Sequence, residues 1–129
     1  RSLPEGPPHY PETQVTDRPV PPMAPELIRE QVLLFTHEEV PYSVAVLIEE
    51  WREGVRGAKI YVRATIYVER DSQRIILIGK AGALLKKVGQ AARTGIETLA
   101  ERPVFLDLWV KVANNWRKDP VMLRRLGYG

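Results

Sequence analysis

The segment IILIGKAGALLKKVG, residues 75–89, sets two glycines inside an apolar stretch that otherwise has helical periodicity. Glycine in a helix interior costs about 0.5–1 kcal/mol relative to alanine, so Gly79 and Gly82 together predict a break. We expect one helix from about Ser72 to Ile78 and a second one that Pro103 closes. The second helix should carry its apolar residues on one stripe, namely Leu85, Val88, Ala92, Ile96 and Leu99.

Three other segments predict strands, because they are rich in β-branched and aromatic residues that alternate with polar ones. They are SVAVLIEEWRE, AKIYVRATIYVER and VFLDLWVKV. Gly54 and Gly57 favour a hairpin between the first two. One face of the second and third strands is apolar, with Ile60, Val62, Ala64, Ile66, Val68, Val104, Leu106, Leu108, Val110 and Val112. The other face carries Tyr61, Arg63, Tyr67, Glu69, Asp107 and Lys111.

Helices are predicted at both ends of this series. Pro25 at a first helical position and Glu26 after it indicate a helix start, and the helix should end near Pro41. Its amphipathic face contains Leu27, Ile28, Gln31, Leu34 and Phe35. Asp119 and Pro120 are a suitable N-cap and first-turn pair for a short basic helix, PVMLRRLG.

The resulting order is helix, strand, strand, helix, helix, strand, helix. It predicts an α+β domain over residues 24–129, in which helices cover one face of a three-stranded sheet. Residues 1–23 precede this domain and are proline-rich, since eight of the eleven prolines lie in residues 1–25. We interpret them as a linker arm. Because the sequence begins with Arg1 and not with Met, we expect it to be a piece of a longer chain.

Composition narrows the possible functions. The chain has no cysteine, which excludes disulfides, thiol nucleophiles and thiolate metal sites and favours a cytoplasmic location. Its apolar runs are much shorter than the roughly 18 residues that a membrane-spanning helix needs. The net charge is only +3, but Lys and Arg concentrate around residues 74–93 and after Trp109. Such a distribution suits a polyanionic partner, or alternatively a solvated helix face.

Catalytic patterns are weak. His37 with Glu38 and Glu39 lacks the spacing that brings metal ligands to one helix face, and no serine lies in a nucleophile motif. Glu49 and Glu50 are adjacent on a strand, so we expect them on opposite faces of the sheet. The pair Gly79-Lys80 does not complete a phosphate-binding P-loop. We therefore expect no enzymatic activity, no metal and no cofactor.

The tetrapeptide GKAG, residues 79–82, instead suggests a binding loop. Glycines let the chain turn sharply without side chains that would hold a ligand away, and the next helix presents its N-terminal amides there. The loop thus suits an anionic backbone. The simpler alternative is a connection whose glycines only cap and turn.

The arrangement of this loop resembles a type II KH domain, in which a GxxG loop between two short helices clamps single-stranded nucleic acid. Over residues 16–128 the chain is similar to the C-terminal half of the bacterial Era GTPase family. The blocks that carry the resemblance are TDRPVPPMAPELIREQVL, EEVPYSVAVLIEEW, IYVERDSQRIILIGKAGALLKKVGQAARTGIE and VFLDLWVKVANNWRKDPVMLRRLGY. The arm segment LPEGPPHYP resembles the chain that leaves the GTPase domain of that family.

This resemblance implies single-stranded RNA binding at the 3′ end of small-subunit ribosomal RNA, in assembly of the small ribosomal subunit. It implies a GTPase domain in the parent chain and no GTP hydrolysis in this region, and peripheral association with the inner face of the cell membrane is reported for some family members. The loop role passes to Gly79, Lys80, Ala81 and Gly82. Family members often have glycine where this chain has Ala81.

Other residues receive roles around the loop. The phosphate-binding candidates are Arg74, Lys86 and Lys87, with Arg93 as a further one. Ile76, Ile78 and Leu85 are candidates for an apolar floor under the bases, or alternatively core residues. For Trp51, Trp109 and Trp116 packing in the core or at its rim is favoured over base stacking.

Two functions of other classes stay open at this point. The basic C-terminal region would suit a protein-interaction module that docks an acidic partner. The loop would also suit an enzyme that holds a phosphorylated small molecule.

Overall fold

The computed structural model describes residues 20–36, 44–54 and 58–126. The elements follow the expected order, with two short 3₁₀ turns added. They are α1 (Met23–Thr36), β1 (Ala45–Glu53), β2 (Ile60–Val68), α2 (Asp71–Ile78), η1 (Lys80–Gly82), α3 (Ala83–Ala100), β3 (Val104–Val112), η2 (Trp116–Lys118) and α4 (Pro120–Arg125). The predicted α+β fold class is confirmed.

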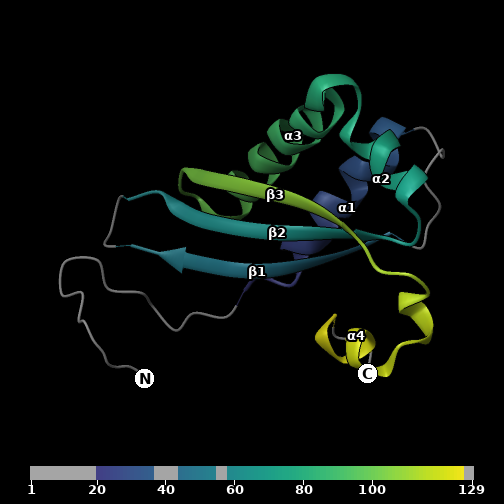
Figure 1. Cartoon of the computed structure of the whole chain (residues 1–129). Helices are drawn as coiled ribbons and strands as arrows, with labels where there is room; N and C mark the ends of the chain where they lie inside the picture. Colours follow the sequence, from purple (N-terminus) through teal and green to yellow (C-terminus); the bar gives the residue numbers. More distant parts are fainter. Residues whose placement is uncertain (1–19, 37–43, 55–57, 127–129) are drawn as a thin grey trace, which may run out of the picture.

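The sheet has the strand order β1-β2-β3. β1 pairs with β2 in antiparallel fashion, with Ala45 opposite Tyr67 and Glu53 opposite Ile60. β2 pairs with β3 in parallel, from Ile60 opposite Val104 to Val68 opposite Val112. A parallel pair needs a crossover connection, and α2 and α3 supply it. Consequently α1, α2 and α3 lie together on one face of the sheet (Figure 1).

The core lies between that face and the three helices. Its fully buried members come from all three strands or their starts and from α1, α2 and α3: Ile28, Val32, Val44, Ile60, Val62, Ala64, Ile66, Val68, Leu77, Val88, Ala92, Ile96 and Val104. The alternation in β2 and the stripe on α3 were thus predicted correctly over most of their length. The stripe on α3 and the apolar face of β3 end early, since Leu99 is 40% exposed and Val112 is 37% exposed.

The first helix differs from its prediction. It begins at Met23, two residues before Pro25, with Glu26 in its first turn. Its buried stripe consists of Ala24, Ile28, Val32 and Thr36, while the expected Leu34 is 58% exposed. The buried hydroxyl of Thr36 has a hydrogen-bond partner, because it donates to the carbonyl of Val32 at 2.8 Å. The expected end near Pro41 lies outside the described residues.

The opposite face of the sheet, here called the outer face, is partly covered as well. η2 and α4 pass below it in Figure 1 and bury Trp116 against Ala45 and Tyr67. Tyr67 is only 6% exposed, although the sequence predicted helices on the other face of the sheet alone. Two ion pairs hold this C-terminal segment, η2 and α4, here called the tail. They join Arg117 to Glu69 at 3.6 Å and Arg125 to Glu49 at 3.7 Å.

A β-bulge in β1 corrects another prediction. The pairing register shifts between Ile48 and Glu50, so one extra residue is accommodated there. Glu49 then accepts a hydrogen bond from the hydroxyl of Thr65 at 2.9 Å. Glu50 forms an ion pair with Arg63 at 3.7 Å. Because Thr65 and Arg63 share the outer face, Glu49 and Glu50 lie on the same face and not on opposite ones.

A buried ion pair closes the hairpin end of the sheet. Glu53 is 2% exposed and accepts hydrogen bonds from Trp51 at 2.9 Å and from Arg102 at 3.0 Å. Arg102 also donates to the carbonyl of Ala58 at 2.7 Å. Arg102, two residues before β3, therefore fastens the β1–β2 connection. The described helices include none that is long and apolar enough to span a bilayer.

Candidate nucleic-acid interface

The turn between α2 and α3 begins at Gly79, which has a backbone conformation that only glycine adopts readily. Its φ is +76° and its ψ is −179°. Its N–H donates to the carbonyl of Ile75 at 3.0 Å and so ends α2. A Cβ atom at this position would lie 2.7 Å from the Cβ of Leu84. Gly79 thus lets the start of α3 approach the end of α2 closely.

The remainder of the turn points outward. Ala81 has φ 54° and ψ 28°, and Gly82 has φ 77° and ψ 9°, so both are left-handed. A Cβ on Gly82 would meet no atom within 4 Å. Lys80 and Ala81 are exposed, as predicted. A ligand can therefore reach this turn, here called the GKAG loop, without displacing any neighbour.

The GKAG loop leads directly into the N-terminus of α3. Gly82 is the N-cap and provides no side chain to cover the first amides of the helix. The exposed side chains nearby are basic, with Lys80 in the loop and Lys86 and Lys87 in the first turns of α3. Amides at a helix N-terminus and lysine ammonium groups both attract anions. The electrostatics of this end of the helix suit phosphate groups.

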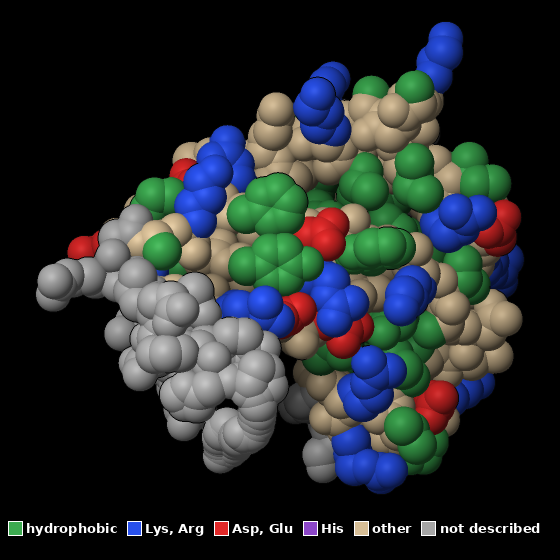
Figure 2. Space-filling model, turned by 60° about the vertical axis from the view of Figure 1, so that its left-hand side comes forward, with side chains coloured by type: hydrophobic (Ala, Val, Ile, Leu, Met, Phe, Trp, Pro, Cys, Tyr) green, Lys and Arg blue, Asp and Glu red, His purple; other side chains and the backbone are tan. Residues whose placement is uncertain are grey.

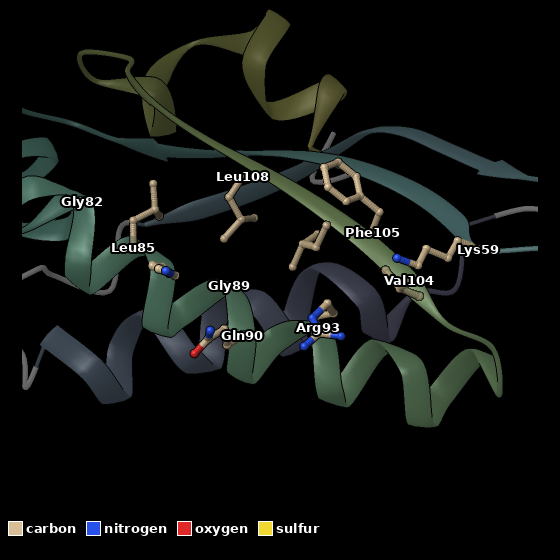
Figure 3. Close-up of a pocket in the computed structure, with 11 residues that line it drawn as sticks. Lys59, Gly82, Leu85, Gly89, Gln90, Arg93, Val104, Phe105 and Leu108 are labelled. Atoms are coloured by element: carbon tan, nitrogen blue, oxygen red, sulfur yellow. The ribbon is translucent and has the colours of Figure 1, made fainter.

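A groove of about 480 Å³ extends from the loop between α3 and β3 (Figure 3). β3 is an edge strand, so its free side faces the groove. The groove is lined by Lys59, Gly82, Leu85, Lys86, Gly89, Gln90, Arg93, Val104, Phe105, Leu106 and Leu108. In Figure 3, Gly82 lies at one end of the groove and Lys59 with Val104 at the other.

The lining of the groove combines an apolar floor with basic and neutral polar groups. Leu85 from α3 and Leu106 and Leu108 from β3 provide the floor. Lys59, Lys86 and Arg93 provide positive charge, and none of the lining residues is acidic. α3 and β3 lie close together at Gly89, because a Cβ added there would be in van der Waals contact with the side chain of Leu108 at 3.5 Å. Bases and phosphates would both find suitable surroundings.

The far end of the groove is fixed by Glu97. Its carboxylate accepts a hydrogen bond from the backbone N–H of Val104 at 2.9 Å. The same oxygen accepts from Arg93 at 3.2 Å. These bonds tie the C-terminal half of α3 to the start of β3.

The structure brings some of the predicted site residues together. Gly82, Leu85 and Lys86 line the groove, as does Arg93. Gly79, Lys80 and Ala81 form the loop at its end. The other predicted residues do not line it, namely Arg74, Ile76, Ile78 and Lys87. Among these, Arg74 pairs with Asp71 at 2.8 Å, and Ile76 packs against the core.

Several lining residues were not predicted. Gly89 and Gln90 follow Leu85 and Lys86 by four residues, so helical spacing from two predicted residues would have found them. The β3 contribution of Val104, Phe105, Leu106 and Leu108 was missed because no single residue in it suggests binding. Only its position as the edge strand beside α3 does so. Lys59 lies just before β2, and nothing in the sequence around it indicated a binding role.

The three tryptophans behave differently. Trp116 is 5% exposed and Trp51 packs against the core, in agreement with their predicted packing. Trp109 is 51% exposed on the outer face of β3. The rim packing predicted for it, in preference to base stacking, stays a prediction. In residues 20–36, 44–54 and 58–126, no group of three or more His, Asp or Glu side chains is placed to hold a metal ion.

Comparison with known families agrees with this geometry. The family model described as KH domain matches residues 39–117, which is more than half of the chain. This chain belongs to the KH-domain family.

Among characterised proteins it is similar to GTPase Era. It is 52% identical to the protein of Carboxydothermus hydrogenoformans over 98% of this chain, and 54% identical to that of Thermotoga maritima over 97%. In both cases the chain spans 42% of the relative's length.

Two solved structures of Era are similar in both sequence and fold. One is an Aquifex aeolicus Era variant bound to GDP.AlF4-, with a TM-score of 0.77. The other is Era in complex with MgGDPNP and nucleotides 1506–1542 of 16S ribosomal RNA, with a TM-score of 0.78. Each is 42% identical to this chain and covers 98% of it, while the chain covers 42% of each.

Proposed function

We propose that this chain is a noncatalytic module that grips a short single-stranded RNA segment in the groove between α3 and β3. The observation that carries the proposal is the continuity of the exposed GKAG loop with an open, acid-free groove that has an apolar floor. Membership in the KH family supports it, because KH domains clamp about four nucleotides with a GxxG loop.

In the proposed mode of binding, phosphates lie on the loop side and bases on the strand side. Lys80, Lys86 and the uncovered amides at the start of α3 face the RNA backbone. Bases enter the groove and rest on Leu85, Leu106 and Leu108. The polar groups of Gln90 and the free edge of β3 can read base edges. Affinity then arises mainly from charge, and sequence preference from the groove.

The RNA that we propose is the 3′ end of small-subunit ribosomal RNA, and the process is assembly of the small ribosomal subunit. The support is the similar Era structure that was solved with nucleotides 1506–1542 of 16S ribosomal RNA. A GTPase domain in the parent protein is proposed on the same grounds, because this chain corresponds to 42% of GTPase Era in length. The cytoplasm is the proposed compartment.

The test of the loop is a charge-reversal variant, Lys80→Asp with Ala81→Asp. Both side chains are exposed, and aspartate tolerates the left-handed conformation of position 81 better than most residues, so the fold should persist. We expect fluorescence anisotropy with a short single-stranded RNA to show a loss of affinity of at least tenfold. Unchanged affinity in a folded variant would reject the loop assignment.

A matched control is available in η2 and α4. Lys118→Asp with Val121→Asp changes the net charge by the same amount at two exposed positions away from the groove. This control should bind RNA nearly as well as the unaltered chain. The proposed target is tested with two oligonucleotides of equal composition, one with the sequence of the 16S 3′ end and one scrambled. The 16S oligonucleotide should bind more tightly than the scrambled one.

The alternative of a basic tail that docks an acidic partner receives less support. Arg117 and Arg125 already pair with Glu69 and Glu49 of the chain's own sheet. The tail therefore fastens α4 to the outer face.

A further inference from the structure

The outer face of the sheet carries an aromatic cluster that the proposed groove does not explain. Phe105 and Trp109 on β3 are each 51% exposed, and Tyr61 on β2 lies opposite Phe105. The rings of Tyr61 and Phe105 stack at a centroid distance of 5.7 Å with an angle of 14° between their planes. We call Tyr61, Phe105 and Trp109 the aromatic platform. Figure 2 shows hydrophobic side chains gathered on one face with acidic and basic ones set among them.

One carboxylate holds two members of the platform in place. Asp107 accepts a hydrogen bond from the hydroxyl of Tyr61 at 3.2 Å and another from the indole N–H of Trp109 at 3.1 Å. The hydroxyl of Tyr61 and the indole N–H of Trp109 therefore both point toward the carboxylate of Asp107. The ring orientations are fixed before any ligand arrives, which reduces the entropy lost on binding.

Cations surround the aromatic platform. The guanidinium of Arg52 lies 5.9 Å from the ring centroid of Tyr61. Glu50 pairs with both Arg52 and Arg63 and so holds two guanidinium groups beside the rings. Lys111 is exposed on the same face of β3. Aromatic rings interspersed with Arg and Lys on an open sheet provide the stacking and charge that single-stranded nucleic acid requires.

The aromatic platform is continuous with the groove. Phe105 lines the groove at the end far from the GKAG loop and also stacks on Tyr61. Figure 3 shows Leu108 pointing from β3 toward α3, whereas Phe105 points to the other side of the strand. β3 is the edge of the sheet, so no further strand separates the two surfaces. A polynucleotide that leaves the groove can pass over this edge.

We propose that a single RNA strand continues from the groove around the edge of β3 and stacks two or more bases on the aromatic platform. This inference rests on the proposed function, because the strand must first occupy the groove. It extends that function by a second contact region and predicts that longer strands bind more tightly. The gain should come from one end of the strand only, since Phe105, the platform residue that lines the groove, lies at the end far from the GKAG loop.

The experiment compares a single strand of about six nucleotides, enough to fill a KH groove, with forms extended at the 5′ or the 3′ end. One extension should raise the affinity about fivefold or more, as expected when bases stack on aromatic side chains. The double variant Tyr61→Leu with Trp109→Leu should lose this gain and bind the six-nucleotide strand within twofold of the unaltered chain. Neither altered residue lines the groove. Trp109→Phe should retain most of the gain.

Leu34→Ser on α1 is the matched control, because it removes another exposed apolar side chain on a different surface. It should leave the gain unchanged, and thermal melting verifies that all variants fold. Trp109 also serves as a reporter. Its fluorescence should be quenched by the favoured extended strand and much less by the six-nucleotide strand.

The possible outcomes separate this inference from the proposed function. If the six-nucleotide strand fails to bind the unaltered chain, the proposed function is wrong. If that strand binds but neither extension adds affinity, or the gain survives in the double variant, the platform inference is overturned. It is also overturned if the double variant leaves RNA binding intact and abolishes self-association in sedimentation, which would identify the face as a protein interface.

Discussion

Gly79 and Gly82 flank the same turn, but they are needed for different reasons. Gly79 combines a conformation that is essentially limited to glycine with a close approach to Leu84. Gly82 has an ordinary left-handed conformation in open space. The sequence shows two equivalent glycines, so this difference could not be predicted from the pattern alone.

This contrast predicts unequal effects of alanine. Gly79→Ala should lower the free energy of unfolding by at least about 2 kcal/mol, because a Cβ would both strain the backbone and contact Leu84. Gly82→Ala should cost only about 1 kcal/mol from its positive φ. Urea denaturation of both variants measures the difference. Equal losses would show that the two positions are equivalent after all.

Ala81 shows what residue type alone can predict. The family resemblance implied that Ala81 stands where members often have glycine, and the structure places it in the left-handed region at φ 54°. Ala81→Gly should relieve strain of about 1–2 kcal/mol but lose about 0.5–1 kcal/mol of backbone entropy. We therefore expect a small rise in the melting temperature in calorimetry. A clear fall would contradict a strained Ala81.

At the level of elements, α3 presents a further test through Gly89, which lines the groove opposite Leu108. Gly89→Ala should raise helix stability by about 0.5–1 kcal/mol. Gly89→Leu should keep most of that stability but project a side chain into the groove and lower RNA affinity at least tenfold. Parallel melting and anisotropy measurements give both quantities. Full affinity with Leu would place the RNA elsewhere.

The buried pair of Glu53 and Arg102 predicts a loss of stability. Glu53 is 2% exposed, and Arg102→Ala would remove the guanidinium group that pairs with its carboxylate. This variant should lower the free energy of unfolding by about 3 kcal/mol. The exposed pair of Arg74 and Asp71 is the comparison, and Arg74→Ala should cost less than about 1 kcal/mol. Similar losses in urea titrations would show that burial of Glu53 adds nothing.

The elements were predicted well where one physical effect dominates. The strand alternation, the break at residues 79–82 and the cap at Asp119 each follow from local chemistry, and the structure confirms them. The errors have tertiary causes. A bulge turned Glu49 and Glu50 to one face, and packing of the tail buried Tyr67. In the site, the loop could be predicted from its two glycines. The residues that line the groove could not, because they depend on which strand lies beside α3.

At the scale of the whole molecule, the distribution of charge predicts the response to salt. Lys80, Lys86 and Lys87 are exposed around the loop, and the groove lining contains no acid. If about three phosphates are neutralised, the logarithm of affinity should fall with the logarithm of salt concentration with a slope near −2. Anisotropy titrations over a range of salt concentrations give this slope. A slope near zero would mean that contacts with phosphates contribute little.

The central claim is that RNA lies between α3 and β3. Amide NMR titration of the ¹⁵N-labelled chain with a single strand of about six nucleotides tests it most directly. We predict the largest shifts at residues 79–90 and 104–108, with little change in α1 and α4. Shifts concentrated in α4, or an absence of shifts at a concentration where the strand binds, would contradict the account.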